Sequence, residues 1–298
     1  MPQNSETAVV SQLSSASQEQ GSAVEGLCEE PRYFVLGPVG MYRDGRPCTP
    51  SALKQRALLA LLLLSANRPV PNHRLVEGLW GSRPPRAAAA TLQMYVTGLR
   101  RALDPAHGAA RRDPRHHPLL ATEVTGYRLR VAPGELDLDR FRAHAAAGRR
   151  LLAEGRCRQA GEAFRRALAL WRGRPFADLE GSGHFGSYGV RLEEERLALL
   201  GEHLDTVLCR GESHEVADAV GQLHELCAAH PLRESFQEQL VRALVRAGRR
   251  AEALAVYARV RGMMVAELGI EPGPRLRAAQ LVALEAREPY AAAHRNCP

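Results

Sequence analysis

The chain has 298 residues, of which 45% are hydrophobic and 24% charged, enough for one large or two medium-sized domains with ample core. Its net charge of +7 is concentrated in one segment, because residues 31–131 carry fifteen arginines and one lysine against five acidic residues. Residues 1–30 carry only acidic charges, and residues 132–298 are nearly neutral. This distribution indicates a polyanionic partner. It disfavours a membrane surface, because the segment has no basic amphipathic helix with bulky aromatic anchors.

The cysteines and the N-terminus bear on the cellular compartment. The six cysteines form no C-x-x-C pair and no zinc-binding spacing, which favours reduced thiols that serve mainly in packing. The N-terminus has neither the basic nor the apolar region of a signal peptide, and the apolar run at 58–64 is too short to span a bilayer. We therefore expect a cytoplasmic protein without metal or cofactor.

The first third of the chain begins with a polar segment and continues into predicted sheet and helix. Residues 1–30 are rich in Ser, Gln and Glu and are expected to be a disordered tail. From Tyr33 onward, short apolar runs broken by Gly-Pro and Arg-Asp-Gly predict a small antiparallel hairpin sheet. Thr49 followed by Pro50 is typical of a helix N-cap and first turn, which predicts a buried helix over 51–66.

Two further helices are predicted after this one. Asn72 is expected to cap a helix with four inward residues: Leu75, Val76, Leu79 and Trp80. A Gly and Pro-Pro turn then leads to a third helix, from near Arg86 to near Asp104. One narrow arc of that helix is apolar, formed by Leu92, Val96, Leu99 and Leu103. The opposite arc is small, polar and basic, formed by Ala90, Met94, Thr97 and Arg101.

This outer arc suits a helix that enters the major groove of duplex DNA, which is about 12 Å wide. Two simpler interpretations remain open: a surface helix with solvated arginines, and core packing for Met94. A basic loop follows, for which a mobile charged segment is the simpler interpretation: Arg111, Arg112, Arg115, His116 and His117. The segment LLATEVTGYRLRV then predicts two strands that turn at Thr125-Gly126. Together these elements predict a winged-helix DNA-binding domain over 31–132, which Pro133-Gly134 ends.

The chain from 136 to 288 is expected to be helical and repetitive. Gly155, Gly211 and Gly248 each end a predicted helix, and apolar residues follow at offsets of 5, 9 and 12. These residues are Ala160, Phe164 and Ala167, then Val216, Val220 and Leu223, then Ala253, Tyr257 and Val260. The pattern is typical of degenerate tetratricopeptide-like helix pairs. We expect Gly181–Gly189 to be a loop and 289–298 a tail, in a fold that is mainly α with a small β part.

The combination of these pieces resembles the Streptomyces antibiotic regulatory protein (SARP) family. The similarity covers roughly residues 32–286 and rests on four segments: LLALLLLSANRPVPNHRLVEGLWG, ATLQMYVTGLRRALDP, TGYRL and ELGIEPGPRLRAAQ. The resemblance implies an OmpR-type winged helix, the kind of effector domain found in two-component systems, joined to a bacterial transcriptional activation domain at 136–288. It also implies a small member of the family, one without the nucleotide-binding domain that larger members append.

The function that the resemblance implies is a promoter-bound activator of a biosynthetic gene cluster for an antibiotic or other secondary metabolite. Such an activator binds tandem direct repeats of double-stranded DNA near the −35 element, as a side-by-side dimer. It recruits RNA polymerase holoenzyme through the sigma factor and other subunits.

The family pattern places the DNA-facing positions on the third helix and in the wing. On the helix they are Thr91, Met94, Thr97, Gly98 and Arg100, with glycine at 98 where many relatives have arginine. In the wing they are Thr125, Gly126, Tyr127 and Arg128. We expect phosphate contacts from Arg86, Thr91, Arg100, Tyr127 and Arg128. We expect Met94 and Thr97 to contact base edges through their methyl groups, and Arg101 to contact guanine.

Enzymatic interpretations are disfavoured. Ser51 and Lys54 match the S-x-x-K motif of penicillin-recognising enzymes, but that site needs a second lysine, and Lys54 is the only one in the chain. The same shortage excludes a Walker A loop, and HELCAAH at 224–230 lacks the histidine spacing of a zinc site. Two non-enzymatic alternatives remain: a tetratricopeptide-type protein-binding adaptor, and a ligand-gated regulator with non-specific DNA affinity.

Overall fold

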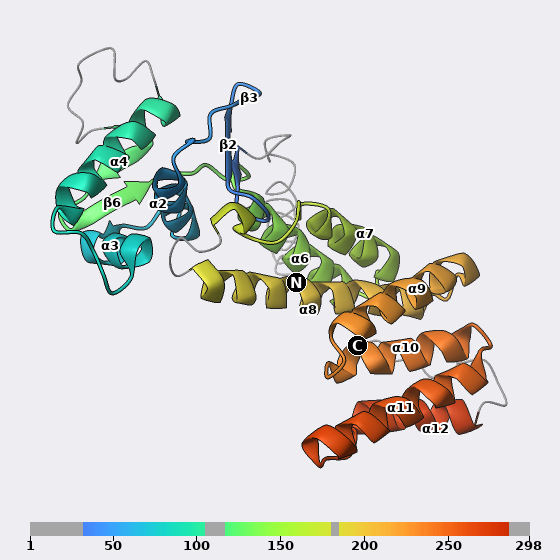
Figure 1. Cartoon of the computed structure of the whole chain (residues 1–298). Coiled ribbons are helices and arrows are strands. Elements are labelled where there is room, and N and C mark those ends of the chain that lie inside the picture. Colours follow the sequence, from blue (N-terminus) through green and yellow to red (C-terminus); the bar gives the residue numbers. More distant parts are fainter. Residues whose placement is uncertain (1–31, 105–116, 180–184, 286–298) are drawn as a thin grey trace, which may run out of the picture. The chain divides into compact units, whose positions relative to one another are not determined.

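The computed structural model describes residues 32–104, 117–179 and 185–285 (Figure 1). The described chain forms two compact units. The first contains residues up to 140 together with 170–192, and the second contains 141–169 with the residues from 193 onward. Sequence composition predicted a boundary at 133–136, whereas the contacts also join 170–192 to the first unit. The expected fold class, mainly helical with a small β part, is confirmed. Within the described ranges, no helix combines the length and hydropathy needed to cross a membrane.

The first unit opens with the expected antiparallel sheet. Its strands pair in the order β1-β2-β3, with bounds β1 Tyr33–Phe34, β2 Gly40–Arg43 and β3 Arg46–Pro47. Asp44 and Gly45 both have positive φ, +51° and +73°, as a tight two-residue hairpin turn requires. The Arg-Asp-Gly signal in the sequence therefore marked this turn correctly.

A winged helix follows, as predicted. Its helices are α2 Leu53–Leu64, α3 Asn72–Trp80 and α4 Ala88–Leu103. A second antiparallel sheet has the order β4-β6-β5, with bounds β4 Val70–Pro71, β5 Leu120–Thr122 and β6 Gly126–Leu129. Helix α2 is buried along most of its length, because Ala57 to Leu63 are all apolar, and it contacts both α3 and α4.

Three details of the helix starts differ from the predictions. Thr49 caps no helix. Its hydroxyl accepts a hydrogen bond from the Met41 amide at 2.8 Å and donates to the Met41 carbonyl, which holds the chain against β2. Asn72 is the first residue of α3 and makes no capping hydrogen bond with its side chain. On α3 only Leu75 and Leu79 are fully buried, while Val76 and Trp80 are half-buried.

The segment after residue 170 completes the first unit by bonding to the first sheet. The Arg172 amide donates to the Leu36 carbonyl at 2.8 Å, and the Phe176 amide donates to the Gly37 carbonyl at 2.9 Å. The short 3-10 helix η2 (Ala177–Leu179) carries Asp178. This carboxylate accepts the Val39 amide at 2.8 Å and pairs with Arg56 of α2, also at 2.8 Å. No local pattern in the sequence predicted this return.

The second unit is a series of antiparallel helix pairs (Figure 1). The helices are α6 Asp137–Ala153, α7 Cys157–Leu168, α8 Phe185–Arg210, α9 Ser213–Ala229, α10 Glu234–Arg246, α11 Arg250–Leu268 and α12 Pro274–Glu285. Helices α6 and α8 begin in the first unit and continue into the second. Because α8 starts at Phe185, the predicted loop at 181–189 is wrong from that residue onward, and 180–184 lie outside the described residues.

The repeat signal in the sequence is confirmed. Gly155, Gly211 and Gly248 end the first helices of three successive pairs, and each has a left-handed φ of +72° to +74° that reverses the chain. The nine apolar residues predicted at fixed offsets from these glycines are all buried. One core cluster in this unit runs from α8 to α12. The expected tails at 1–30 and 289–298 lie outside the described residues.

A buried carboxylate, Asp137, joins the first sheet to the start of α6 within the first unit. Its oxygens accept the amides of Val35 at 2.9 Å, Leu36 at 3.0 Å and Leu138 at 2.8 Å. The guanidinium of Arg172 lies 4.0 Å away. Burial raises the pKa of Asp137 to about 6, although the three amides and Arg172 favour the carboxylate. The carboxylate therefore satisfies three amides at the cost of its own desolvation.

We expect Asp137→Ala to destabilise the first unit by about 3 kcal/mol or more, because it leaves buried amides unpaired. The pKa of Asp137 is raised in the folded state. Its contribution to the free energy of unfolding is therefore greatest at low pH and declines as the pH rises through 6. The difference in the free energy of unfolding between wild type and Asp137→Ala should therefore shrink from pH 4.5 to pH 7.

Urea unfolding followed by tryptophan fluorescence tests this, because Trp80 and Trp171 are the two tryptophans of the chain and both belong to the first unit. Asp139→Ala, at an exposed position on the same first turn of α6, is the matched control. If both variants lose the same free energy of unfolding at every pH, the role given to Asp137 is contradicted.

Candidate nucleic-acid interface

Helix α4 has one buried and one exposed face, as its sequence predicted. Leu92, Val96, Leu99 and Leu103 are each at most 2% exposed and pack within the winged helix. The opposite face is exposed and comprises Ala90, Gln93, Met94, Thr97 and Arg101. Met94 is 59% exposed, so the alternative that it packs in the core is wrong. Thr97 donates its hydroxyl hydrogen to the Gln93 carbonyl at 2.9 Å, which turns its methyl group away from that bond.

The exposed face of α4 carries positive charge that no other described residue neutralises through an ion pair. Arg83 and Arg86 precede the helix, Arg101 lies in its last turn, and all three are exposed. None of them forms an ion pair with another described residue. The first turn of α4 contains no acidic residue and no capping side chain, so its amides add to the positive potential beside Arg86. Thr91 is half-buried in the same region.

Arg100 connects α4 to the wing. Its guanidinium donates to the Leu120 carbonyl at 2.9 and 3.0 Å and to the Thr122 hydroxyl at 2.7 Å, and it lies 5.9 Å from the centre of the Tyr127 ring. His117 was predicted in a basic loop, but it is 2% exposed. Its Nδ1 accepts the Leu119 and Leu120 amides, and its Nε2 lies 3.3 Å from the Arg100 carbonyl. The two residues hold the end of α4 against β5.

The tip of the wing is formed by the residues between β5 and β6. Val124 is fully exposed there and Thr125 is exposed beside it, while Arg128 is paired with Glu123. Tyr127 is only 7% exposed and supports the hairpin from within. The expected turn is therefore confirmed, and Thr125 is the surface residue among the four positions predicted in the wing. Arg111, Arg112, Arg115 and His116 lie outside the described residues.

Two glycines of the predicted interface have distinct packing. Gly98 faces the side chain of Gln55 on α2, and a Cβ at this position would stand 2.6 Å from its amide nitrogen. Gly126 lies against β4, where a Cβ would stand 1.9 Å from the Val70 carbonyl oxygen. The obstacle at Gly98 is the end of a flexible side chain, whereas at Gly126 it is backbone. Gly126 is thus required for the pairing of β4 with β6.

Sequence reasoning missed a second basic helix start beside the wing. The amide of Asn72, the first residue of α3, donates to the Thr125 carbonyl at 2.9 Å, so this helix begins next to the wing turn. His73 and Arg74 are exposed in that first turn, which contains no acidic residue. Arg74 pairs with Glu77 at 3.2 Å. The available signal was the Pro-Asn-His-Arg run at a helix start, a common anion-binding arrangement.

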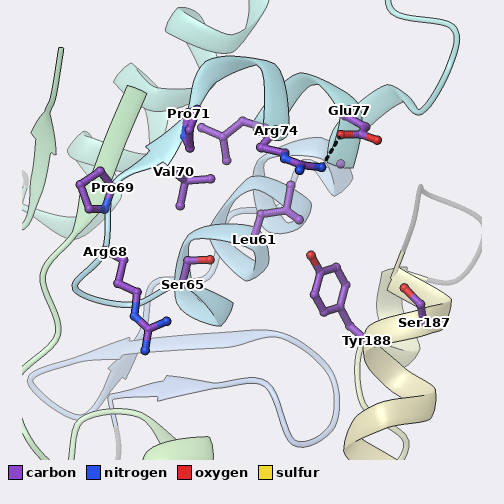
Figure 2. Close-up of a pocket in the computed structure, with 12 residues that line it drawn as sticks. Leu61, Ser65, Arg68, Pro69, Val70, Pro71, Arg74, Glu77, Ser187 and Tyr188 are labelled. Carbon is purple, nitrogen blue, oxygen red and sulfur yellow. Dashed lines mark hydrogen bonds and ion pairs between the residues drawn. The ribbon is translucent and has the colours of Figure 1, made fainter. Parts of the chain in front are cut away.

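A hollow of about 430 Å³ lies behind α3 in the first unit (Figure 2). Leu61, Val70 and Pro71 line it from the winged helix, and Ser187 and Tyr188 line it from the first turns of α8. Figure 2 shows Tyr188 reaching from α8 toward Leu61. The start of α8 thus lines a hollow together with residues of the winged helix.

We expect Gly126→Ala to destabilise the first unit by about 2–4 kcal/mol, because the added methyl group has to displace β4 backbone. Gly186→Ala is the control, since a Cβ there meets nothing within 4 Å and alanine is the better helix former. Thermal unfolding monitored by tryptophan fluorescence compares the two. A Gly126→Ala protein as stable as Gly186→Ala would disprove the close approach of β4 and β6.

Comparison with known proteins identifies both parts of the chain. Residues 49–129 match the model of the C-terminal domain of transcriptional regulatory proteins, and residues 136–282 match the model of the bacterial transcriptional activator domain. Regulatory protein AfsR of Streptomyces coelicolor is 42% identical over 256 residues, which is 86% of this chain and 24% of AfsR. The chain therefore spans about a quarter of the length of that relative.

Two other similar proteins are closer in length. Regulatory protein DnrI of Streptomyces peucetius is 37% identical over 252 residues, covering 85% of this chain and 91% of DnrI. Among solved structures, Mycobacterium tuberculosis EmbR, in a complex with a low-affinity phosphopeptide, superposes with a TM-score of 0.79 at 35% identity. That match covers 88% of this chain and 67% of the EmbR chain.

Proposed function

The chain belongs to the SARP family of transcriptional regulators, and from this premise we propose that it binds promoter DNA through α4 and the wing and activates a secondary-metabolite gene cluster. The observation that carries the proposal is the exposed basic surface at α4, where Arg83, Arg86 and Arg101 have no ion-pair partner among the described residues. The anionic backbone of a nucleic acid offers a regular array of charges to such a face. Action on promoter DNA places the protein in the cytoplasm.

The residues of this interface divide into four roles. Arg86, Thr91, Arg128 and the start of α3 contact phosphates and set the register of the helix in the groove. Met94 and Thr97 present methyl groups to thymine, and Arg101 donates to guanine. Arg100, Gly126 and Tyr127 position the wing, because their contacts are mainly internal. Val124 and Thr125 form the tip that approaches the adjacent minor groove.

The helical second unit supplies the contact with the transcription machinery in this proposal. Its net charge is close to zero, which suits a protein partner better than DNA. Two protomers bind tandem direct repeats near the −35 element side by side, and the complex recruits RNA polymerase holoenzyme through the sigma factor and other subunits. A protein-binding adaptor and a ligand-gated regulator are the alternatives, and neither requires sequence-specific DNA binding.

DNase footprinting of the promoters around the protein's own gene tests the proposal directly. The expected result is protection of two direct repeats spaced by about one helical turn, roughly 10–10.5 base pairs. The salt dependence of binding to that fragment and to a scrambled fragment separates the alternatives. An adaptor would bind both fragments weakly and equally at every salt concentration.

Substitutions on α4 separate base contacts from phosphate contacts. Arg101→Ala should weaken binding to the cognate site by on the order of 1–3 kcal/mol and remove the preference at one base pair. Arg86→Ala should weaken binding to all sequences and lower the slope of log K against log salt by about 0.9. Fluorescence-anisotropy titrations on a set of single-base variants provide both quantities.

The matched control is Arg259→Ala, an exposed arginine on α11 in the second unit. It should leave affinity, sequence preference and salt slope unchanged. An Arg101→Ala protein that behaves like this control would exclude a base-reading role for Arg101.

A further inference from the structure

Two cysteines from successive helix pairs lie against each other in the second unit. Cys157 follows Gly155 by two residues and starts α7, and Cys209 precedes Gly211 by two residues near the end of α8. Their sulfur atoms lie 3.7 Å apart, and both side chains are half-buried. The cysteines are thus in contact across the joint between the first and second helix pairs, and both are accessible to small reagents.

A helix start and several charged side chains lie beside the two thiols. Cys157 lies at the positive end of the α7 dipole, whose first turn contains no acidic residue. Basic side chains flank both sulfurs in the sequence, and the nearest are held in place: Arg158 pairs with Glu212 at 2.9 Å, and Arg210 pairs with Glu212 and Glu215 at 3.0 and 2.9 Å. A thiolate is the form that attacks a peroxide or a disulfide.

The other described cysteines, Cys48 and Cys227, have no such neighbouring sulfur. Burial raises the pKa of Cys227 to about 11 and also raises that of Cys48, and no contact joins either residue to another described thiol. Cys48 lies in the first unit and Cys227 is enclosed in the core of the second. The described residues therefore hold one sulfur pair at a distance from which bond formation requires only a small adjustment.

We propose that Cys157 and Cys209 form a redox-responsive modification site that closes to an intramolecular disulfide when a peroxide or a low-molecular-weight disulfide is present. With hydrogen peroxide, the Cys157 thiolate attacks one oxygen, forms a sulfenic acid and releases hydroxide. The Cys209 thiol then attacks that sulfur, the S–S bond forms and water leaves. In total two thiols are oxidised and one peroxide is reduced to two waters.

The bond would lock helices that line a groove of the second unit. Arg158 and Gly161 of α7 and His203, Leu204 and Arg210 of α8 all border a hollow of about 570 Å³, which residues of α9 close. The disulfide would close a loop of about fifty residues and fix the two helix pairs at this groove, which stabilises the folded unit by restricting the unfolded chain. The modification therefore acts on the surface that lies between the first two pairs.

Peptide mass spectrometry on the full-length protein tests bond formation. The purified chain is treated with hydrogen peroxide or oxidised glutathione, its remaining thiols are blocked with N-ethylmaleimide, and it is digested with trypsin. Because Arg156 and Arg158 flank Cys157, the expected product is the dipeptide 157–158 joined to peptide 197–210, two hydrogens lighter than the sum. Reduction with dithiothreitol should release both peptides.

Variants make the assignment specific. Cys157→Ser and Cys209→Ser should each abolish the linked peptide, whereas Cys48→Ser is the matched control and should retain it. Replacing Cys28 and Cys297 by serine in the background removes the two remaining thiols from competition. A disulfide that joins two chains, one that uses Cys48 or Cys227, or thiols that stay reduced in fully oxidised glutathione would each overturn the proposal.

A stability measurement provides the second test. Both tryptophans belong to the first unit, so their fluorescence follows that unit, whereas circular dichroism at 222 nm follows all helices, most of which lie in the second unit. Oxidation should raise the unfolding temperature of these helices by several degrees in wild type and leave it unchanged in Cys209→Ser. Should the serine variants fold poorly, Cys157→Ala and Cys209→Ala repeat the comparison. An equal shift in wild type and variants would contradict a bond between these two residues.

Discussion

The constraint on which the proposed recognition surface depends is the burial of one stripe of α4. Leu92, Val96, Leu99 and Leu103 lose almost all contact with water, and burial of an aliphatic side chain contributes roughly 1.5–3 kcal/mol. Once these four side chains are fixed in the core, the helix has no rotational freedom. Met94, Thr97 and Arg101 then have to face outward. Exposure of their polar or flexible side chains to water carries no free-energy penalty there. The position of the recognition surface is a consequence of core packing.

The wing is fixed to this helix by polar contacts that come from the chain around it. Arg100 and His117 hold the end of α4 against β5, and Gly126 lets β6 approach β4 without a steric obstacle. The start of α3 is bonded to the wing turn through Asn72 and Thr125. Helix and wing are therefore one assembly. A charge that was expected to meet phosphate, Arg100, serves largely to build the surface from which other side chains reach outward.

Two carboxylates from outside the winged helix complete the first unit. Asp137 satisfies amides of the first sheet and of α6, and Asp178 links η2 to the sheet and to α2. Both carboxylates lie beyond the winged helix in the sequence and complete its unit in space. The helix pairs that follow are held by apolar packing, with ion pairs and the two thiols at their joints. The chain thus combines a basic winged helix with a nearly neutral series of packed helix pairs.

The sequence by itself determined the elements whose signals are local or periodic. The buried stripe of α4, the Asp44-Gly45 turn and the glycine-based helix pairs could all be derived, because each depends on neighbours within about one helical turn or on a repeated spacing. The tertiary structure alone decided the remainder. The return of 170–192 to the first unit, the burial of His117, the internal role of Arg100 and the contact of Cys157 with Cys209 join residues that are 17 to more than 100 positions apart. No local pattern records such pairings, because they follow from how whole elements pack, and packing energies are summed over the complete fold.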